Sequence, residues 1–110
     1  MKILNLNSIK TTLAHNEIKR KALVKVGDLQ SKVQTVNYAW LEPGEYFSPH
    51  KHDDCEELYF FLEGKGEMKI NDKTFEVKKN DFVVVEKGEW HSLKNNSSKK
   101  LIFFSVRILI

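Results

Sequence analysis

Apolar and polar residues alternate in short runs along most of the chain, and this alternation limits the possible fold more than any other feature. The clearest run ends the sequence. There every second residue, which we call one parity of the strand, is apolar: Ile102, Phe104, Val106, Ile108 and Ile110. Ser105 and Arg107 occupy the other parity. Successive side chains of a β-strand point to opposite faces, so this run predicts a strand with one apolar face.

Other runs of strand length are separated by turn signals. Residues 33–41 are rich in β-branched and aromatic side chains and are followed by Pro43-Gly44. Residues 58–62 form a continuous apolar run, and residues 82–85 form a β-branched one. Asn71-Asp72 separates two alternating segments and predicts a tight hairpin turn between them.

About eight such runs, spaced by roughly ten residues, predict an all-β sandwich or barrel. We expect a single domain over residues 1–110, because this length supports one hydrophobic core and no linker or repeat interrupts it. The only segment with weak helical periodicity, residues 9–21, is too short and too charged to predict a helix.

The charge of the chain argues against a nucleic-acid-binding protein. Lys and Arg number 18 against 15 Asp and Glu, a net charge of +3 that is spread along the sequence. We interpret the densest basic stretch, Lys19-Arg20-Lys21, as the solvated face of a strand. No run approaches the ~18 apolar residues of a membrane span, and no secretory signal is evident. A single cysteine, Cys55, suits a reducing compartment, so we expect a cytoplasmic protein.

Two histidines with one residue between them, His50 and His52, are followed by Glu57 and, further along, by His91. Alternate side chains of a strand share a face, so the first two can point into one cavity. Imidazole and carboxylate are good ligands for Zn²⁺, Fe²⁺, Mn²⁺, Ni²⁺ or Cu²⁺. Such a set leaves open coordination positions, as in sites that bind ligands or do chemistry. The alternative is a vacant site with unrelated histidines.

The segment from Gly44 to Gly64 resembles the first motif of the cupin superfamily, which is Gly, five residues, His-x-His, three or four residues, Glu, six residues and Gly. Residues 80–95 resemble its second motif. Asn80 stands where the family has its first Gly, and Glu86 where it has Pro. Asn tolerates the left-handed backbone conformation, so we expect the turn at position 80 to survive.

The resemblance implies a small antiparallel jelly-roll β-barrel. It also implies that a divalent transition metal is held by the four residues that match the family's ligands: His50, His52, Glu57 and His91. Neither departure from the motifs falls on one of these positions.

Residues near the motifs have competing interpretations. Glu56 is a less favoured alternative to Glu57 as the ligand, and Cys55 is either a soft or redox-sensitive ligand or, more commonly, a small buried hydrophobe. Tyr59 shares the parity of Glu57, so we expect it to face the cavity, either as a partner of a bound ligand or as core. Trp90 is expected to point away from the metal. The pattern assigns Asn95 a structural role.

Function is the least determined property. We expect a metal-binding protein that acts on a small oxygen-rich anion or metabolite, in the manner of dioxygenase-, decarboxylase- or isomerase-like cupins. The alternative is a non-catalytic module that binds or senses a small molecule. The run at 58–62 is apolar on both faces of its strand. Leu58, Phe60 and Leu62 lie on one face, and Tyr59 and Phe61 lie with Glu57 on the other. A strand of this kind needs cover on its second face, which predicts a homodimer.

Overall fold

A computed structural model describes residues 1–14 and 17–110. Its described part contains one 3₁₀ turn, η1 (Leu6–Ser8), and ten strands. The first five strands are β1 (Thr11–Ala14), β2 (Ile18–Val24), β3 (Val33–Leu41), β4 (Tyr46–His50) and β5 (Cys55–Glu63). The other five are β6 (Lys65–Ile70), β7 (Lys73–Lys78), β8 (Phe82–Val85), β9 (His91–Lys94) and β10 (Leu101–Leu109).

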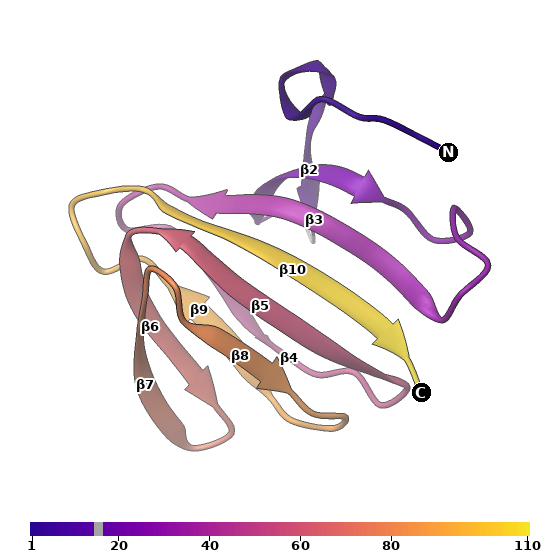
Figure 1. Ribbon diagram of the computed structural model, residues 1–110. Helices are drawn as coiled ribbons and strands as arrows, with labels where there is room; N and C mark the ends of the chain where they lie inside the picture. Colours follow the sequence, from indigo (N-terminus) through magenta and orange to yellow (C-terminus); the bar gives the residue numbers. More distant parts are fainter. Residues whose placement is uncertain (15–16) are drawn as a thin grey trace.

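The strands form two antiparallel sheets that lie one above the other (Figure 1). The larger sheet has the order β1-β2-β3-β10-β5-β8, and the smaller has the order β4-β9-β6-β7. The all-β prediction is confirmed. Among the described strands, no pairing joins the two sheets, so the structure is a pair of facing sheets and not one continuously hydrogen-bonded barrel.

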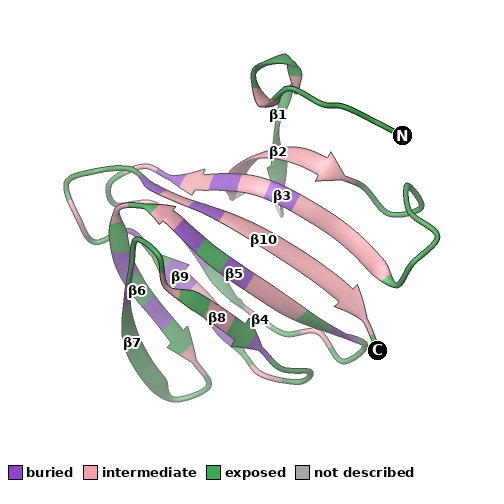
Figure 2. Cartoon of the chain, in the orientation of Figure 1, coloured by how far each residue is buried: buried purple, intermediate pink, exposed green. Residues whose placement is uncertain are grey.

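The two sheets enclose one hydrophobic core. Leu41, Phe61 and Phe103 come from the larger sheet, and Phe47 and Leu93 from the smaller one; none is more than 1% exposed. Each occupies the inward parity of its strand, because alternate side chains of a strand share a face. Figure 2 shows the buried positions of β3 and β10 gathered toward one end, while the other end of these two strands is only partly buried. The strand β5 is buried toward the same end and also at Cys55, its first residue.

Polar residues occupy the inner face at this other end. The register pairs Thr35 of β3 with Arg107 of β10, and Arg107 with Glu57 of β5. Two residues along, Ser105 pairs with Asn37 on one side and with Tyr59 on the other. The same three strands therefore carry the core at one end and polar groups at the other.

The turns follow the sequence signals. Asn71 has a φ of 51° at the tight hairpin between β6 and β7, and Asn80 has a φ of 75°. Asn80 thus provides the left-handed turn that Gly provides in the family motif. The amide of Glu86 donates to the Glu89 carboxylate at 2.7 Å, a bond that the family's Pro could not make.

Residues 9–21 contain β1 and the first part of β2, which confirms that their weak helical periodicity is not a helix signal. Part of this segment, residues 15 and 16, lies outside the described residues. No helix in the described chain has the length and apolar character needed to cross a membrane.

Candidate metal centre

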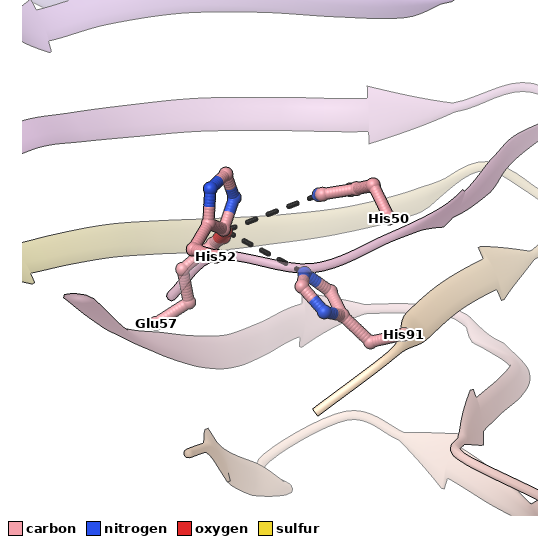
Figure 3. Close-up of side chains that lie close together, drawn as sticks. All are labelled: His50, His52, Glu57 and His91. Atoms are coloured by element: carbon pink, nitrogen blue, oxygen red, sulfur yellow. Dashed lines mark ion pairs between the residues drawn. The ribbon is translucent and has the colours of Figure 1, made fainter. Parts of the chain in front are cut away.

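The four predicted ligands come together at the polar end of the space between the sheets (Figure 3). His50 ends β4 and His91 begins β9, and the register pairs these two residues directly. Glu57 lies near the start of β5, on the inner parity. His52 lies in the loop between β4 and β5, where its carbonyl accepts the Gly88 amide at 2.8 Å. That bond joins the loop that carries His52 to the loop that precedes His91.

The side chains converge on a common point. One ligand atom from each of the four residues lies within 4.8 Å of every other. Oε1 of Glu57 lies 2.5 Å from Nε2 of His52, 3.5 Å from Nε2 of His91 and 3.9 Å from Nε2 of His50. The carboxylate therefore faces all three imidazoles.

Backbone carbonyls orient two of the imidazoles. Nδ1 of His50 lies 3.1 Å from the Ser48 carbonyl, and Nδ1 of His91 lies 3.1 Å from the Glu89 carbonyl. A carbonyl can only accept, so each Nδ1 carries a proton, and Nε2 is the ring nitrogen that faces the cluster. Histidines that bind metals are commonly fixed by such an outer hydrogen bond.

The electrostatics favour the deprotonated forms of Glu57 and His50. Burial alone would raise the pKa of the Glu57 carboxyl, but the interactions with His91, His52 and Tyr59 outweigh it and lower this pKa to about 2. Burial, aided by the neighbouring His91 and His52, lowers the pKa of His50 despite the opposing Ser48 carbonyl and Glu57. A carboxylate and neutral imidazoles are the forms that bind a metal ion.

Tyr59 faces the pocket, as predicted from its parity, and its ring is also part of the core. Its hydroxyl donates to Oε2 of Glu57 at 2.9 Å. Burial and the Glu57 carboxylate raise the pKa of Tyr59 well above its ordinary value, so the hydroxyl stays a donor. Tyr59 thus holds the oxygen of Glu57 that is turned away from His52.

The donor set fits a divalent transition metal. Nε2 of His91 is buried and has no hydrogen-bond partner, although it lies within 4.8 Å of the other three ligand atoms. A buried nitrogen lone pair without a partner is costly. A metal ion among the four residues would provide that partner and would leave coordination positions open toward the pocket.

Other predictions near the motifs have clear outcomes. Glu56 is exposed and lies outside the cluster, which leaves Glu57 as the carboxylate. Cys55 is buried, and burial together with the Asp54 carboxylate raises the pKa of its thiol to about 11, as expected for a buried hydrophobe. Trp90 is 49% exposed and lies beside Lys51, away from the pocket.

Asn95 is structural, as predicted. It is fully buried, and its amide nitrogen donates to the carbonyls of Leu41, at 2.9 Å, and Lys99, at 2.7 Å. Its Oδ1 accepts from the amide and the hydroxyl of Ser97. These bonds fix the connection between β9 and β10 at the core end of the sheets.

A pocket of about 380 Å³ opens from the ligand cluster toward β2, β3 and β10. Its polar lining beyond the cluster includes Arg20, Asn37, Ser105 and Arg107. The interpretation of Lys19-Arg20-Lys21 as a solvated strand face is wrong for its middle residue. Strand alternation turns Arg20 inward, opposite in direction to its two lysine neighbours.

Sequence reasoning placed Arg107 on the polar parity of the last strand but gave it no role, and it did not single out Asn37. A usable signal was present, because Arg20 and Arg107 are the only arginines in the sequence. Both lie on strands at the parity that faces the pocket.

A family model described as "Cupin domain" matches residues 38–107. The chain is a cupin. The match includes both motifs and all four residues of the candidate metal centre, so the resemblance inferred from the motif spacing is confirmed.

Similar proteins include an "Oxalate-binding protein" from Thermotoga maritima, 30% identical over 94 residues that cover 86% of this cupin and 78% of the relative. A crystal structure of "a predicted oxalate decarboxylase" from Thermotoga maritima has a TM-score of 0.92, with 25% identity over 99% of this chain and 100% of that one. A polyketide cyclase from Streptomyces resistomycificus, 20% identical, shares the fold with a TM-score of 0.85 over 98% of this chain and 79% of that one.

Proposed function

We propose that this cupin binds a divalent transition metal ion (Zn, Fe, Mn, Ni or Cu) through His50, His52, Glu57 and His91, and that the site takes up a small oxygen-rich anion. The observation that carries the proposal is the convergence of these four ligand atoms at the wall of a pocket, with Nε2 of His91 lacking any other partner. When bound, the metal supplies positive charge and open coordination positions for anionic oxygens.

Residues of the chain set the properties of that site. Tyr59 and the two backbone carbonyls fix the directions of Glu57, His50 and His91 before any ion arrives. This preorganisation lowers the cost of binding a metal. The basic side chains in the pocket favour an anion over a neutral ligand.

The ligand class that best fits is a small carboxylate, and oxalate is its simplest test compound. The oxalate-binding relative supports this choice. So does the pocket lining, in which Arg20, Lys25 and Arg107 outnumber the single described carboxylate, Glu57.

We propose binding in preference to catalysis. A general acid or base within reach of an open metal position would favour an enzyme. Apart from the metal ligands, Tyr59 is the lining residue whose hydrogen bond reaches the described cluster, and its hydroxyl already donates to Glu57. An enzyme of the decarboxylase, dioxygenase or isomerase type is the second candidate, favoured by the similarity to a predicted oxalate decarboxylase.

Metal content and anion binding test the proposal together. Elemental analysis of the purified wild type should give nearly one metal ion per chain, and His52→Ala should lose most of it. Calorimetry should then detect oxalate binding to metal-loaded protein and weaker binding, or none, to metal-free protein. Equal metal in the wild type and His52→Ala would contradict the ligand assignment.

Product analysis separates the two candidate functions. Dicarboxylates, 2-oxo acids and sugars are incubated under air with protein loaded with Fe²⁺, Mn²⁺ or Ni²⁺. Binding without conversion supports the binding module, whereas metal-dependent turnover of any compound replaces it with the enzyme.

We also propose that the single domain, residues 1–110, forms a homodimer in the cytoplasm. The outer face of the larger sheet supports this, because Tyr38 lies beside Trp40 and Phe104, with ring centroids 6.0 and 5.7 Å apart, and none of the three is buried. Phe60, on the next strand, is 38% exposed. A mass near 12.9 kDa by light scattering at micromolar concentration would rule the dimer out.

A further inference from the structure

Arginine is used very selectively in this chain. Lys and Arg together number 18, yet Arg20 and Arg107 are the only arginines, and both line the pocket. Among the lysines of the described chain, only Lys25 belongs to that lining. A guanidinium offers a planar fork of donors that matches a carboxylate, which the point charge of a lysine does not. The two arginines therefore indicate recognition of a planar anion.

Neither arginine is paired with a carboxylate in the part of the chain that the structure describes. Across residues 1–14 and 17–110, no ion pair includes Arg20 or Arg107. Glu57 is the cross-strand neighbour of Arg107, but its carboxylate is directed at the three histidines and at Tyr59. Two cations in one pocket without anionic partners favour the binding of an anion from solution.

Buried atoms without partners mark the same region. In the described part of the chain, three buried side-chain nitrogen or oxygen atoms have no hydrogen-bond partner: Nε of Arg20, Oδ1 of Asn37 and Nε2 of His91. All three belong to the pocket or to the metal centre beside it. Asn37 is only 8% exposed. Such groups cost free energy unless a ligand or an ordered water satisfies them.

The sheet register places these residues together on the wall formed by β2, β3 and β10, which are neighbours in the sheet (Figure 1). Arg20 pairs with Ala39, and Arg107 pairs with Thr35. Asn37 lies between those two positions on the same face of β3. Arg20 and Arg107 thus lie on the two strands that flank Asn37, whereas His50 and His91 come from the opposite sheet.

We propose that Arg20, Asn37 and Arg107 form a second subsite, which binds the far carboxylate of a small dicarboxylate whose near carboxylate lies at the metal centre. The proposal rests on the function proposed above and extends it to dicarboxylates longer than oxalate. The arginines donate to the carboxylate oxygens. The Asn37 amide carries a donor and an acceptor side by side, so it bonds to the carboxylate or to a hydroxyl next to it.

Succinate and butyrate test the subsite, because they have the same carbon chain and differ in one carboxylate. Calorimetry on metal-loaded wild type should show succinate binding at least about tenfold more tightly than butyrate. Arg20→Gln should remove most of this difference, because it should lower the affinity for succinate much more than the affinity for butyrate, and it should leave the metal content unchanged. Arg20→Lys, which keeps the charge but loses the fork, should fall between the two.

Lys19→Gln is the matched control, because it removes one positive charge from the adjacent residue of β2, whose side chain pairs with Glu45 outside the pocket. It should keep the wild-type preference for succinate. Equal affinities for succinate and butyrate in the wild type would overturn the subsite, as would equal losses of succinate affinity in Lys19→Gln and Arg20→Gln.

Asn37→Leu provides a second variant with a readout that a structural role would not give. Removal of a buried amide whose Oδ1 has no partner should keep or raise the melting temperature of the ligand-free protein, while the affinity for succinate falls several-fold. A lower melting temperature with unchanged succinate affinity would show that Asn37 is structural and would remove it from the subsite.

Metal-free protein separates the failure of the subsite from the failure of the metal centre. If the wild type takes up no metal but still prefers succinate to butyrate in an Arg20-dependent manner, the metal proposal fails and the subsite stands. If metal binds and oxalate binds to it, but the second carboxylate of succinate adds nothing, the subsite fails alone.

Discussion

The inner face of the larger sheet has two ends with opposite chemistry. At one end, which we call the closed end, Ala39 and Phe61 flank Phe103 in the register, and all three side chains are buried and apolar. At the other end, which we call the open end because the pocket and the ligand cluster lie there, the corresponding row is Thr35, Arg107 and Glu57. The strands β3, β10 and β5 contribute to both rows, so the difference between the ends comes from the residues along each strand and not from which strands are present.

This contrast separates stability from function along the strands. The closed end contributes buried apolar area, which is the dominant favourable term in folding. The open end instead gathers polar and charged groups whose mutual arrangement is costly without a ligand or an ion. Substitutions at the two ends should therefore have different consequences even where the residues are equally buried.

Phe103→Ala should produce the largest loss of stability. Phe103 is 1% exposed, and its ring lies 5.7 Å from that of Tyr59 and 5.8 Å from that of Phe61. Removal of such a ring from a core costs about 3–5 kcal/mol. Denaturant unfolding of metal-free protein measures the effect.

His91→Ala is the matched comparison, because His91 is also 1% exposed but lies at the open end. In metal-free protein we expect a loss well below that of Phe103→Ala, since the change removes one hydrogen bond and the contact with Glu57 but also an otherwise unpartnered nitrogen. Equal losses for the two variants would contradict the division of the inner face.

Acid should weaken the metal-free protein through Glu57. The pKa of this carboxyl is lowered from 4.5 to about 2 in the folded state, so its contribution is complete above pH 4.5 and is lost as the pH falls from there toward 2. The shift corresponds to a contribution on the order of 3 kcal/mol. Denaturant unfolding at pH values from 5 downward should show this loss in the wild type and not in Glu57→Gln. If the stability of the wild type and of Glu57→Gln falls equally with pH, the Glu57 carboxylate is not the cause of the acid sensitivity.

Tyr59→Phe should have the smallest effect on stability, about 1 kcal/mol, because it removes one hydrogen bond and keeps the buried ring. Its effect should appear in metal affinity, where loss of an outer partner of a ligand typically costs tenfold to a hundredfold. Tyr38→Phe removes a hydroxyl from the outer face of the same sheet and should leave metal affinity unchanged. Competition with a chelator of known affinity measures both variants.

Much of the fold and the cluster followed from local pattern. Alternation predicted the strands, Asn71 and Asn80 marked turns with left-handed backbone, and motif spacing selected His50, His52 and Glu57. These predictions succeed because each depends on a few consecutive residues or on a spacing that the resemblance supplied. The predicted count of about eight strands fell short of the ten in the described residues, and no strand run was predicted for the segment that forms β1.

What the sequence by itself determined about this protein is its all-β class, its cupin family and the set of candidate metal ligands. The tertiary structure alone decided that Arg20, Asn37 and Arg107 share one pocket. Their strands are distant in the sequence, and only the register of β2, β3 and β10 brings them onto one wall. Parity tells which residues share a face of a strand, but which face looks into the pocket depends on how the two sheets pack.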